Sequence, residues 1–109
     1  MTEEIHSYGY RTPRFPTDFN FTLQTGDRLP ALLEAHCCDL SEDGMGAEMA
    51  EMLEIGAKVT LILTLPGSST SMRIAARVVA RHFDGYGFAF VFSSQSECDY
   101  IQQYLATLR

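Results

Sequence analysis

The chain has 109 residues, of which 46% are hydrophobic and 20% charged, a composition typical of a globular protein rather than a disordered one. Eight basic residues stand against fourteen acidic ones. The resulting net charge of −6 argues against a nucleic acid polymer as a partner, because binding along a phosphate backbone needs a broad basic face. A single domain of this length can bury a core without disulfides or metals.

Nothing in the sequence predicts membrane insertion or secretion. No apolar run approaches the roughly 20 residues of a membrane-spanning helix, and the first ten residues are acidic and polar, unlike a signal peptide. The three cysteines, Cys37, Cys38 and Cys98, are an odd number without CxxC spacing, which argues against a disulfide framework. We therefore expect a cytoplasmic protein with free thiols.

The first part of the chain predicts an arm followed by strands. Residues 1–14 are polar and interrupted by glycine and proline, so we expect a flexible arm there and a folded domain over 15–109. Hydrophobic and polar residues alternate over 19–24 with the period of a half-buried strand. Residues 30–40 suit a second strand, although 32–35 would also suit a helix.

A turn and a further strand are expected next. Residues 39–44 gather acids, a serine and a glycine, which favour a tight turn. A short strand or a helical turn is expected over 49–53. Residues 58–65 are rich in β-branched and aliphatic side chains and end at Pro66-Gly67, which is typical of a strand and the turn after it.

Residues 72–83 fit two periods. Three arginines four residues apart could line one face of a helix, but the same segment also alternates with a period of two. Turn signals at both ends favour a strand, followed by a hairpin turn at Asp84-Gly85 and another strand over 86–92. On the solvent side of the first of these strands we expect the three arginines, Arg73, Arg77 and Arg81.

The chain ends in a predicted amphipathic helix. Ser94 and Glu97 have the spacing of a capping box, in which each side chain satisfies an amide at the start of a helix. Hydrophobic residues then recur at helical spacing, at Ile101, Tyr104, Leu105 and Leu108. Five or six antiparallel strands and one terminal helix predict an all-β fold, a small barrel whose open end the helix could cover.

No group of residues predicts catalysis. Cys37 and Cys38 are consecutive strand residues that point to opposite faces, which argues against a shared metal ion. The acidic run from Asp39 to Glu54 lacks the spacing of a calcium loop. A cysteine nucleophile needs a neighbouring base, and the sequence does not show that any histidine lies beside a cysteine in the fold. We therefore expect no enzyme, no metal and no cofactor.

Two segments together resemble the signatures of the PilZ domain family. The arm carries Tyr10-Arg11-Thr12-Pro13-Arg14, similar to the family's RxxxR segment, and Asp39-x-Ser41-x-x-Gly44 matches its D/NxSxxG turn in full. The resemblance covers nearly the whole chain and includes the strand at 85–92 and the closing helix. It implies a six-stranded antiparallel β-barrel of the PilZ type with a C-terminal α-helix.

The resemblance also implies a receptor for cyclic di-GMP, a bacterial second messenger. A guanidinium can donate to guanine O6 and N7 or pair with phosphate, and a carboxylate can accept from guanine N1 and N2. A serine can add a hydroxyl, and a glycine lets the backbone come close to the ligand. The candidate ligand-binding residues are Arg11, Arg14, Asp39, Ser41 and Gly44, with Tyr10 as a further candidate.

The sequence departs from the family pattern at Tyr10, which stands where the first arginine of RxxxR belongs, with Arg11 one position later. Two functions therefore stay open. One is a receptor that binds cyclic di-GMP and signals through an unidentified downstream protein to motility, biofilm or exopolysaccharide production. The other is a degenerate PilZ domain that binds no nucleotide and acts as an adapter between proteins. We expect a monomer or a weak homodimer.

Overall fold

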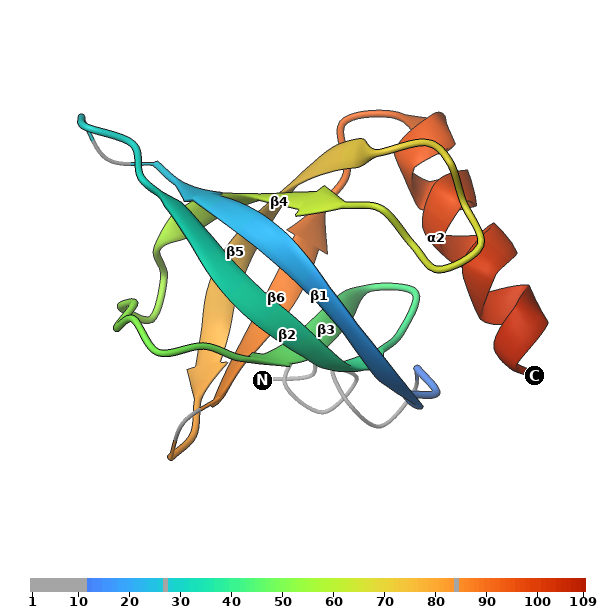
Figure 1. Ribbon diagram of the computed structural model, residues 1–109, viewed down its shortest axis with the longest axis horizontal. Coiled ribbons are helices and arrows are strands. Elements are labelled where there is room, and N and C mark those ends of the chain that lie inside the picture. The colour runs from blue at the N-terminus through green and yellow to red at the C-terminus, as the bar shows by residue number, and fades with distance from the viewer. Residues whose placement is uncertain (1–11, 27, 84) are drawn as a thin grey trace, which may run out of the picture.

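The computed structural model describes residues 12–26, 28–83 and 85–109, which form a closed β-barrel with a helix at one end (Figure 1). The elements are β1 (Phe15–Thr25), β2 (Leu32–Leu40), β3 (Gly44–Glu48), β4 (Lys58–Leu63), β5 (Met72–Arg81), β6 (Gly85–Val91) and α2 (Gln95–Leu108). Neighbouring strands pair antiparallel in the order β1-β2-β3-β6-β5-β4. The predicted fold class, a six-stranded antiparallel barrel with a C-terminal helix, is confirmed.

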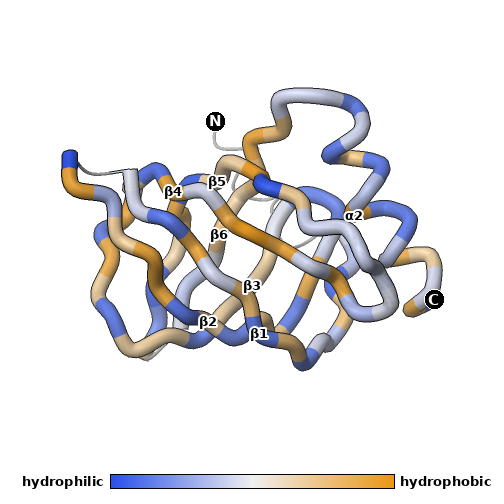
Figure 2. Tube along the Cα trace, turned by 45° about the horizontal axis from the view of Figure 1, so that its top comes forward, coloured by the Kyte–Doolittle hydropathy of each residue, from blue (hydrophilic) through white to orange (hydrophobic). Residues whose placement is uncertain are grey.

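Side chains that alternate along each strand divide the barrel into a hydrophobic interior and a polar exterior. In β5, Ile74, Ala76 and Val78 are buried, whereas Arg73 and Arg77 are exposed. Hydrophobic and hydrophilic stretches alternate along the strands in Figure 2. The strand interpretation of residues 72–83 is therefore confirmed, because a helix would bury positions three and four apart instead.

Strand β1 begins at Phe15, earlier than its alternation predicts. Phe15 and Pro16 pair with Leu40 and Asp39 of β2, and the register shifts between Pro16 and Phe19 before regular pairing resumes. This irregularity interrupts the period-two pattern, so the sequence indicates only the later part of the strand. The early pairing brings the residues just before β1 beside the end of β2.

The expected strand or helical turn over 49–53 is wrong. The third strand lies earlier, at Gly44–Glu48, where two glycines obscure the alternation of side chains. Residues 49–57 form a loop, which is anchored because the buried Leu53 donates its amide to the Tyr86 hydroxyl at 2.9 Å. The alternative helix over 32–35 is also excluded, since all four residues lie in β2 and pair with β1.

Helix α2 closes one end of the barrel with Ile101 and Leu105, which are both buried (Figure 1). The Ser94 hydroxyl accepts from the Glu97 amide at 3.4 Å, as the capping box predicts. The reciprocal half of the box is wrong. The Glu97 carboxylate accepts from the amide and hydroxyl of Ser93, at 2.9 and 2.7 Å, because Ser93 offers it two donors at once.

Three predicted features involve residues outside the described part of the chain. These are the arm positions Tyr10 and Arg11 and the turn residue Asp84. Gly85 opens β6, and its carbonyl accepts from the His82 amide at 2.8 Å, which holds β5 and β6 together at the hairpin. Within the described residues, no helix is long and apolar enough to span a membrane.

Candidate ligand-binding site

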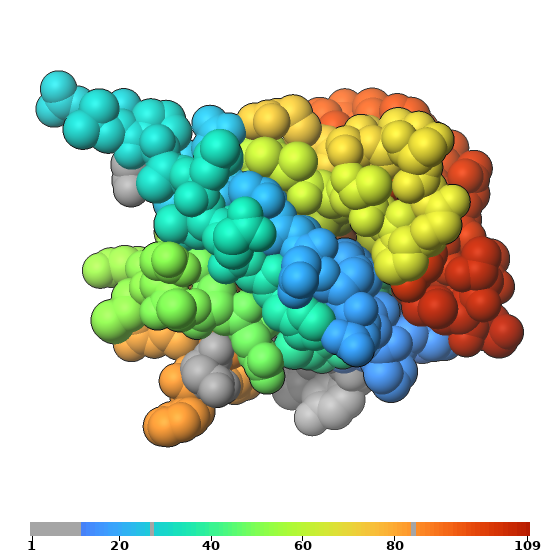
Figure 3. Space-filling model, in the orientation of Figure 1, coloured from blue at the N-terminus to red at the C-terminus, as the bar shows by residue number. Residues whose placement is uncertain are grey.

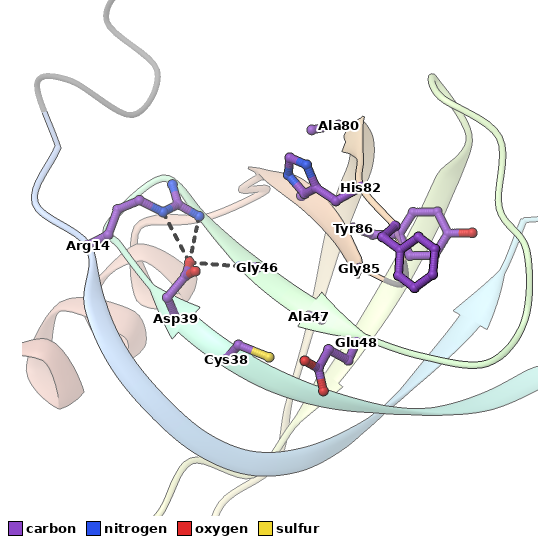
Figure 4. A pocket seen from close by; sticks show the side chains of 12 residues that line it. Arg14, Cys38, Asp39, Gly46, Ala47, Glu48, Ala80, His82, Gly85 and Tyr86 are labelled. Atoms are coloured by element: carbon purple, nitrogen blue, oxygen red, sulfur yellow. Dashed lines mark hydrogen bonds and ion pairs between the residues drawn. The ribbon is translucent and has the colours of Figure 1, made fainter.

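An arginine–carboxylate pair joins the start of β1 to the end of β2. Both Nε and Nη2 of Arg14 donate to Oδ1 of Asp39, at 3.0 and 2.7 Å (Figure 4). The pairing of Pro16 with Asp39 accounts for this contact, because it places the residue two positions earlier beside the same carboxylate. Both side chains keep solvent access, at 25% for Arg14 and 38% for Asp39, so a ligand can reach the pair.

Gly46 of β3 positions the Asp39 carboxylate through a backbone hydrogen bond. Its amide donates to Asp39 Oδ1 at 3.0 Å, and a Cβ at this position would lie only 2.8 Å from Oδ2. A side chain here would therefore push the carboxylate away. Gly46 was not predicted as a site residue, although a second glycine two residues after Gly44 is a signal that could have indicated it.

Ser41 and Gly44 lie beneath the site rather than on its surface. Ser41 is fully buried, and its hydroxyl donates to Asp43 Oδ1 at 2.7 Å, while its amide donates to the Gly44 carbonyl at 2.9 Å. A Cβ on Gly44 would overlap the carbonyl oxygen of Phe88 in β6. In this structure the two residues therefore hold the turn and the β3–β6 pairing together.

Thr12 ties the end of the arm to the same turn. Its hydroxyl donates to Asp43 Oδ2 at 3.0 Å, so both oxygens of Asp43 accept hydrogen bonds, one from Thr12 and one from Ser41. With Arg14 on Asp39, two carboxylates of the turn fix the described end of the arm. This arrangement brings together two of the predicted site residues, Arg14 and Asp39.

A groove of about 460 Å³ begins at this pair and runs over the outside of β2, β3, β6 and β5. Its floor is almost without side chains, since Gly46 pairs directly with Gly87, which in turn pairs with Ala80. Larger side chains stand along the groove, as Figure 4 shows for His82 and Glu48. The fully exposed Phe83 also lines it.

The thiols near the site are not activated for nucleophilic attack. Burial, followed by the Glu48 and Asp39 carboxylates, raises the pKa of Cys38, which lines the groove. Desolvation by burial raises the pKa of Cys37 from 9.0 to about 12. Both thiols are protonated near neutral pH, and the thiolate is the reactive form. The described residues also contain no cluster of three or more His, Cys, Asp or Glu that could hold a metal ion.

These features define a β-barrel domain with an open groove on its outer face and an arginine–carboxylate pair at one end of that groove. The family model of the PilZ domain matches residues 10–107, and the chain belongs to this family. The resemblance found in the sequence is therefore confirmed. PilZ domains typically are non-catalytic receptor domains, and the family typically binds cyclic di-GMP.

Solved structures of PilZ domains share the fold at low sequence identity. The PilZ domain of CeSA from a cellulose-synthesizing bacterium matches with a TM-score of 0.72 and 16% identity, covering 88% of this chain and 97% of that one. The PilZ domain of YcgR from Escherichia coli with c-di-GMP matches with a TM-score of 0.70 and 18% identity, covering 92% and 91%. The MrkH–c-di-GMP complex of K. pneumonia matches with a TM-score of 0.71 and 15% identity, covering 90% and 50%. No curated protein sequence matches the chain.

Proposed function

We propose that this chain is a cytoplasmic receptor for cyclic di-GMP, which binds in the groove beside Arg14 and Asp39. The observation that carries the proposal is the position of this solvent-accessible pair at the end of a groove with a glycine floor. Family membership supports the choice of ligand, because PilZ domains typically bind cyclic di-GMP.

The pair has the chemistry to recognise a guanine. Within the described residues, all three hydrogen bonds to the Asp39 carboxylate go to Oδ1, so Oδ2 remains an acceptor for the N1 and N2 hydrogens of guanine. The planar guanidinium of Arg14 can lie on a purine face or donate to guanine O6, N7 or a phosphate. One base and one phosphate of the ligand thus find partners at this end of the groove.

The rest of the groove suits a flat ligand. Gly46 and Gly87 lie side by side in adjacent strands and let a purine or a ribose lie directly on the sheet. Phe83 offers an exposed aromatic ring on which a base can stack, a contact worth about 1–3 kcal/mol per base.

The arm supplies the remaining contacts in this proposal. Arg11 replaces the missing first arginine of RxxxR as a phosphate partner, and Tyr10 stacks on a base. Ser41 and Gly44 contribute through the turn that presents Asp39. Ligand binding orders the arm, residues 1–14, against the barrel domain, residues 15–109, and a downstream protein recognises the altered surface.

A second candidate function is an adapter that binds no nucleotide. It is favoured by the Arg14–Asp39 ion pair, which already satisfies both charges within the protein, and by Tyr10 in place of the first arginine. In that case the pair serves only to fasten the arm to the barrel.

Titration calorimetry with cyclic di-GMP separates the two functions. The receptor predicts saturable heat for the wild type and an affinity about 10- to 100-fold weaker for Asp39→Ala, because a charged hydrogen-bond partner of about 1.5–3 kcal/mol is lost. Asp18→Ala is the matched control, since Asp18 is an exposed aspartate of β1 that pairs with His36 outside the groove. No heat at high ligand concentration, or equal losses for the two variants, would contradict the proposal.

A further inference from the structure

One outer wall of the barrel collects basic residues in an otherwise acidic chain. Strands β4 and β5 turn three exposed cations outward: Lys58, Arg73 and Arg77. Arg81 follows the register shift between Val78 and Ala80 and points to the other side, where it donates to the Leu53 carbonyl. We call Lys58, Arg73 and Arg77 the basic wall. In the described part of the chain none of them forms an ion pair with an acidic residue.

Two of these cations face each other directly. Lys58 and Arg77 are partners in the β4–β5 ladder, and both side chains are exposed on the same side of the sheet. Like charges opposite each other destabilise a strand pair. A bound carboxylate would remove this repulsion.

A small hollow lies between the two cations. It has a volume of about 170 Å³, and besides Lys58 and Arg77 it is lined by Ala75 and Val91, which are partners in the β5–β6 ladder. Val91 is 51% exposed and adds apolar surface to the hollow. An apolar hollow with a cationic rim fits an aliphatic side chain that has a carboxylate next to it.

The chain itself presents such a pair of side chains. Glu54 is exposed and Ile55 is 58% exposed, at a turn closed by a hydrogen bond from the Ala57 amide to the Glu54 carbonyl at 3.0 Å. The left-handed Gly56, with φ of +92°, completes the turn. The loop that carries it projects from the side of the barrel in Figure 3, where it is coloured green.

The turn and the hollow lie on neighbouring parts of one surface. The Gly56 amide donates to the Val78 carbonyl at 2.7 Å, and the Val78 amide donates to the Ala57 carbonyl at 3.0 Å. These bonds hold the turn against β5, and Ala57 directly precedes Lys58 of the hollow. A surface that carries both halves of a contact can pair with a copy of itself through a two-fold axis.

We propose that two copies of this chain form a symmetric dimer in which Ile55 of each copy enters the hollow of the other. Glu54 then lies between Lys58 and Arg77 of the second copy, where its negative charge attracts both cations and reduces their mutual repulsion. The net charge of −6 on each copy opposes association. The dimer is therefore expected to be weak.

Sedimentation velocity of the full chain without nucleotide, over a concentration series from micromolar to millimolar, tests the dimer. The wild type shifts from monomer to dimer across the series. Arg77→Glu weakens association at least about tenfold, because it replaces attraction by repulsion at the contact. Arg28→Glu is the matched control, since it makes the same change in net charge at an exposed position of the β1–β2 loop that does not line the hollow.

A charge exchange gives the decisive comparison. Glu54→Arg alone weakens the dimer, and the double variant Glu54→Arg with Arg77→Glu restores it. Thermal unfolding checks that each variant folds, which is expected because both positions are exposed. A monomer at every concentration overturns the proposal, and so does a dimer that Arg77→Glu and Arg28→Glu weaken equally.

Discussion

Asp39 and Ser41 belong to one motif but differ in what they expose. Asp39 keeps over a third of its side chain accessible beside the groove, whereas Ser41 is fully buried and its hydroxyl bonds within the turn. A motif derived from sequence treats the two positions alike. Burial separates a residue that a ligand can touch from one that positions its neighbours.

Ser41→Ala is expected to lower the free energy of unfolding by about 1–3 kcal/mol, because the Asp43 carboxylate then loses a buried donor. Urea unfolding measures the change. Ser68→Ala is the control, since the Ser68 hydroxyl bonds to Thr70 in an exposed loop, and its effect should stay within about 0.5 kcal/mol. Equal effects at the two serines would show that the Ser41 hydroxyl does not stabilise the turn.

Tyr10→Arg and Arg11→Ala test how the arm binds the ligand. If the missing arginine weakens binding, Tyr10→Arg should tighten cyclic di-GMP binding by about 10- to 100-fold, less some screening by salt. If Arg11 has taken over the phosphate contact, Tyr10→Arg changes little and Arg11→Ala removes most of the binding. Calorimetry on both variants decides between these outcomes, and unchanged affinity in both would exclude the arm as a source of a second cation.

Only part of the site could be predicted from the sequence. Arg14 and Asp39 were found because they stand at fixed places in two motifs. The glycine floor of the groove was not predicted, since Gly46 and Gly87 are far apart in the sequence and become neighbours only through the register of β3 and β6. Phe83 was also missed, because nothing in a local pattern shows that its ring lies exposed at a groove.

At the scale of the elements, β1, β2 and α2 meet around a buried thiol. The Thr17 hydroxyl lies 3.1 Å from the Cys37 sulfur, and the Cys37 charge contributes to the raised pKa of Tyr104 after desolvation by burial. Tyr104 in turn packs edge-on against Phe19, with ring centroids 6.3 Å apart. The helix thus closes the barrel over the segment that begins directly after Arg14.

Because of this buried thiol, we expect the free energy of unfolding to decrease as the pH rises through the alkaline range. The Cys37 pKa rises from 9.0 to about 12 on folding, so between these values the folded state binds the extra proton. Its contribution to stability is complete below pH 9 and is lost as the pH rises towards 12. Urea unfolding from about pH 8 to about pH 10.5 should show a steeper loss for the wild type than for Cys37→Ala. Cys98→Ala, on the helix, should behave as the wild type, and identical slopes in all three proteins would contradict this assignment.

The strands that alternate strictly were predicted best. In β5 the alternation identified Ile74, Ala76 and Val78 as buried, and the turn signals excluded a helix; a register shift ends the alternation after Val78, so Ala80 lines the outer groove instead. The prediction failed at 49–53 because β3 contains two glycines, which carry no side chain to alternate. A side chain at Gly44 would clash with Phe88, and one at Gly46 would clash with Asp39. Because Phe88 and Asp39 belong to other strands, the local periodicity of β3 could not indicate why these positions are glycines.

At the scale of the whole molecule, the closed barrel separates two surfaces with different proposed tasks. The groove lies over β2, β3, β6 and the end of β5, and the hollow of the basic wall lies over β4, β5 and β6. Each described strand has two hydrogen-bonded neighbours, but β1 (Phe15–Thr25) pairs with β4 only over Thr22–Thr25, so the first part of β1 is paired along one edge, to β2.

An NMR titration of the isotopically labelled protein with cyclic di-GMP tests the central claim most directly, because it reports binding and location together. The proposal predicts that the amide signals of Gly46, Gly85 and Gly87 and the Nε signal of Arg14 shift with increasing ligand and then saturate. The amides of Gly56 and Gly67, in loops outside the groove, should stay in place. An unchanged spectrum at millimolar ligand, or shifts confined to residues outside the groove, would contradict the account.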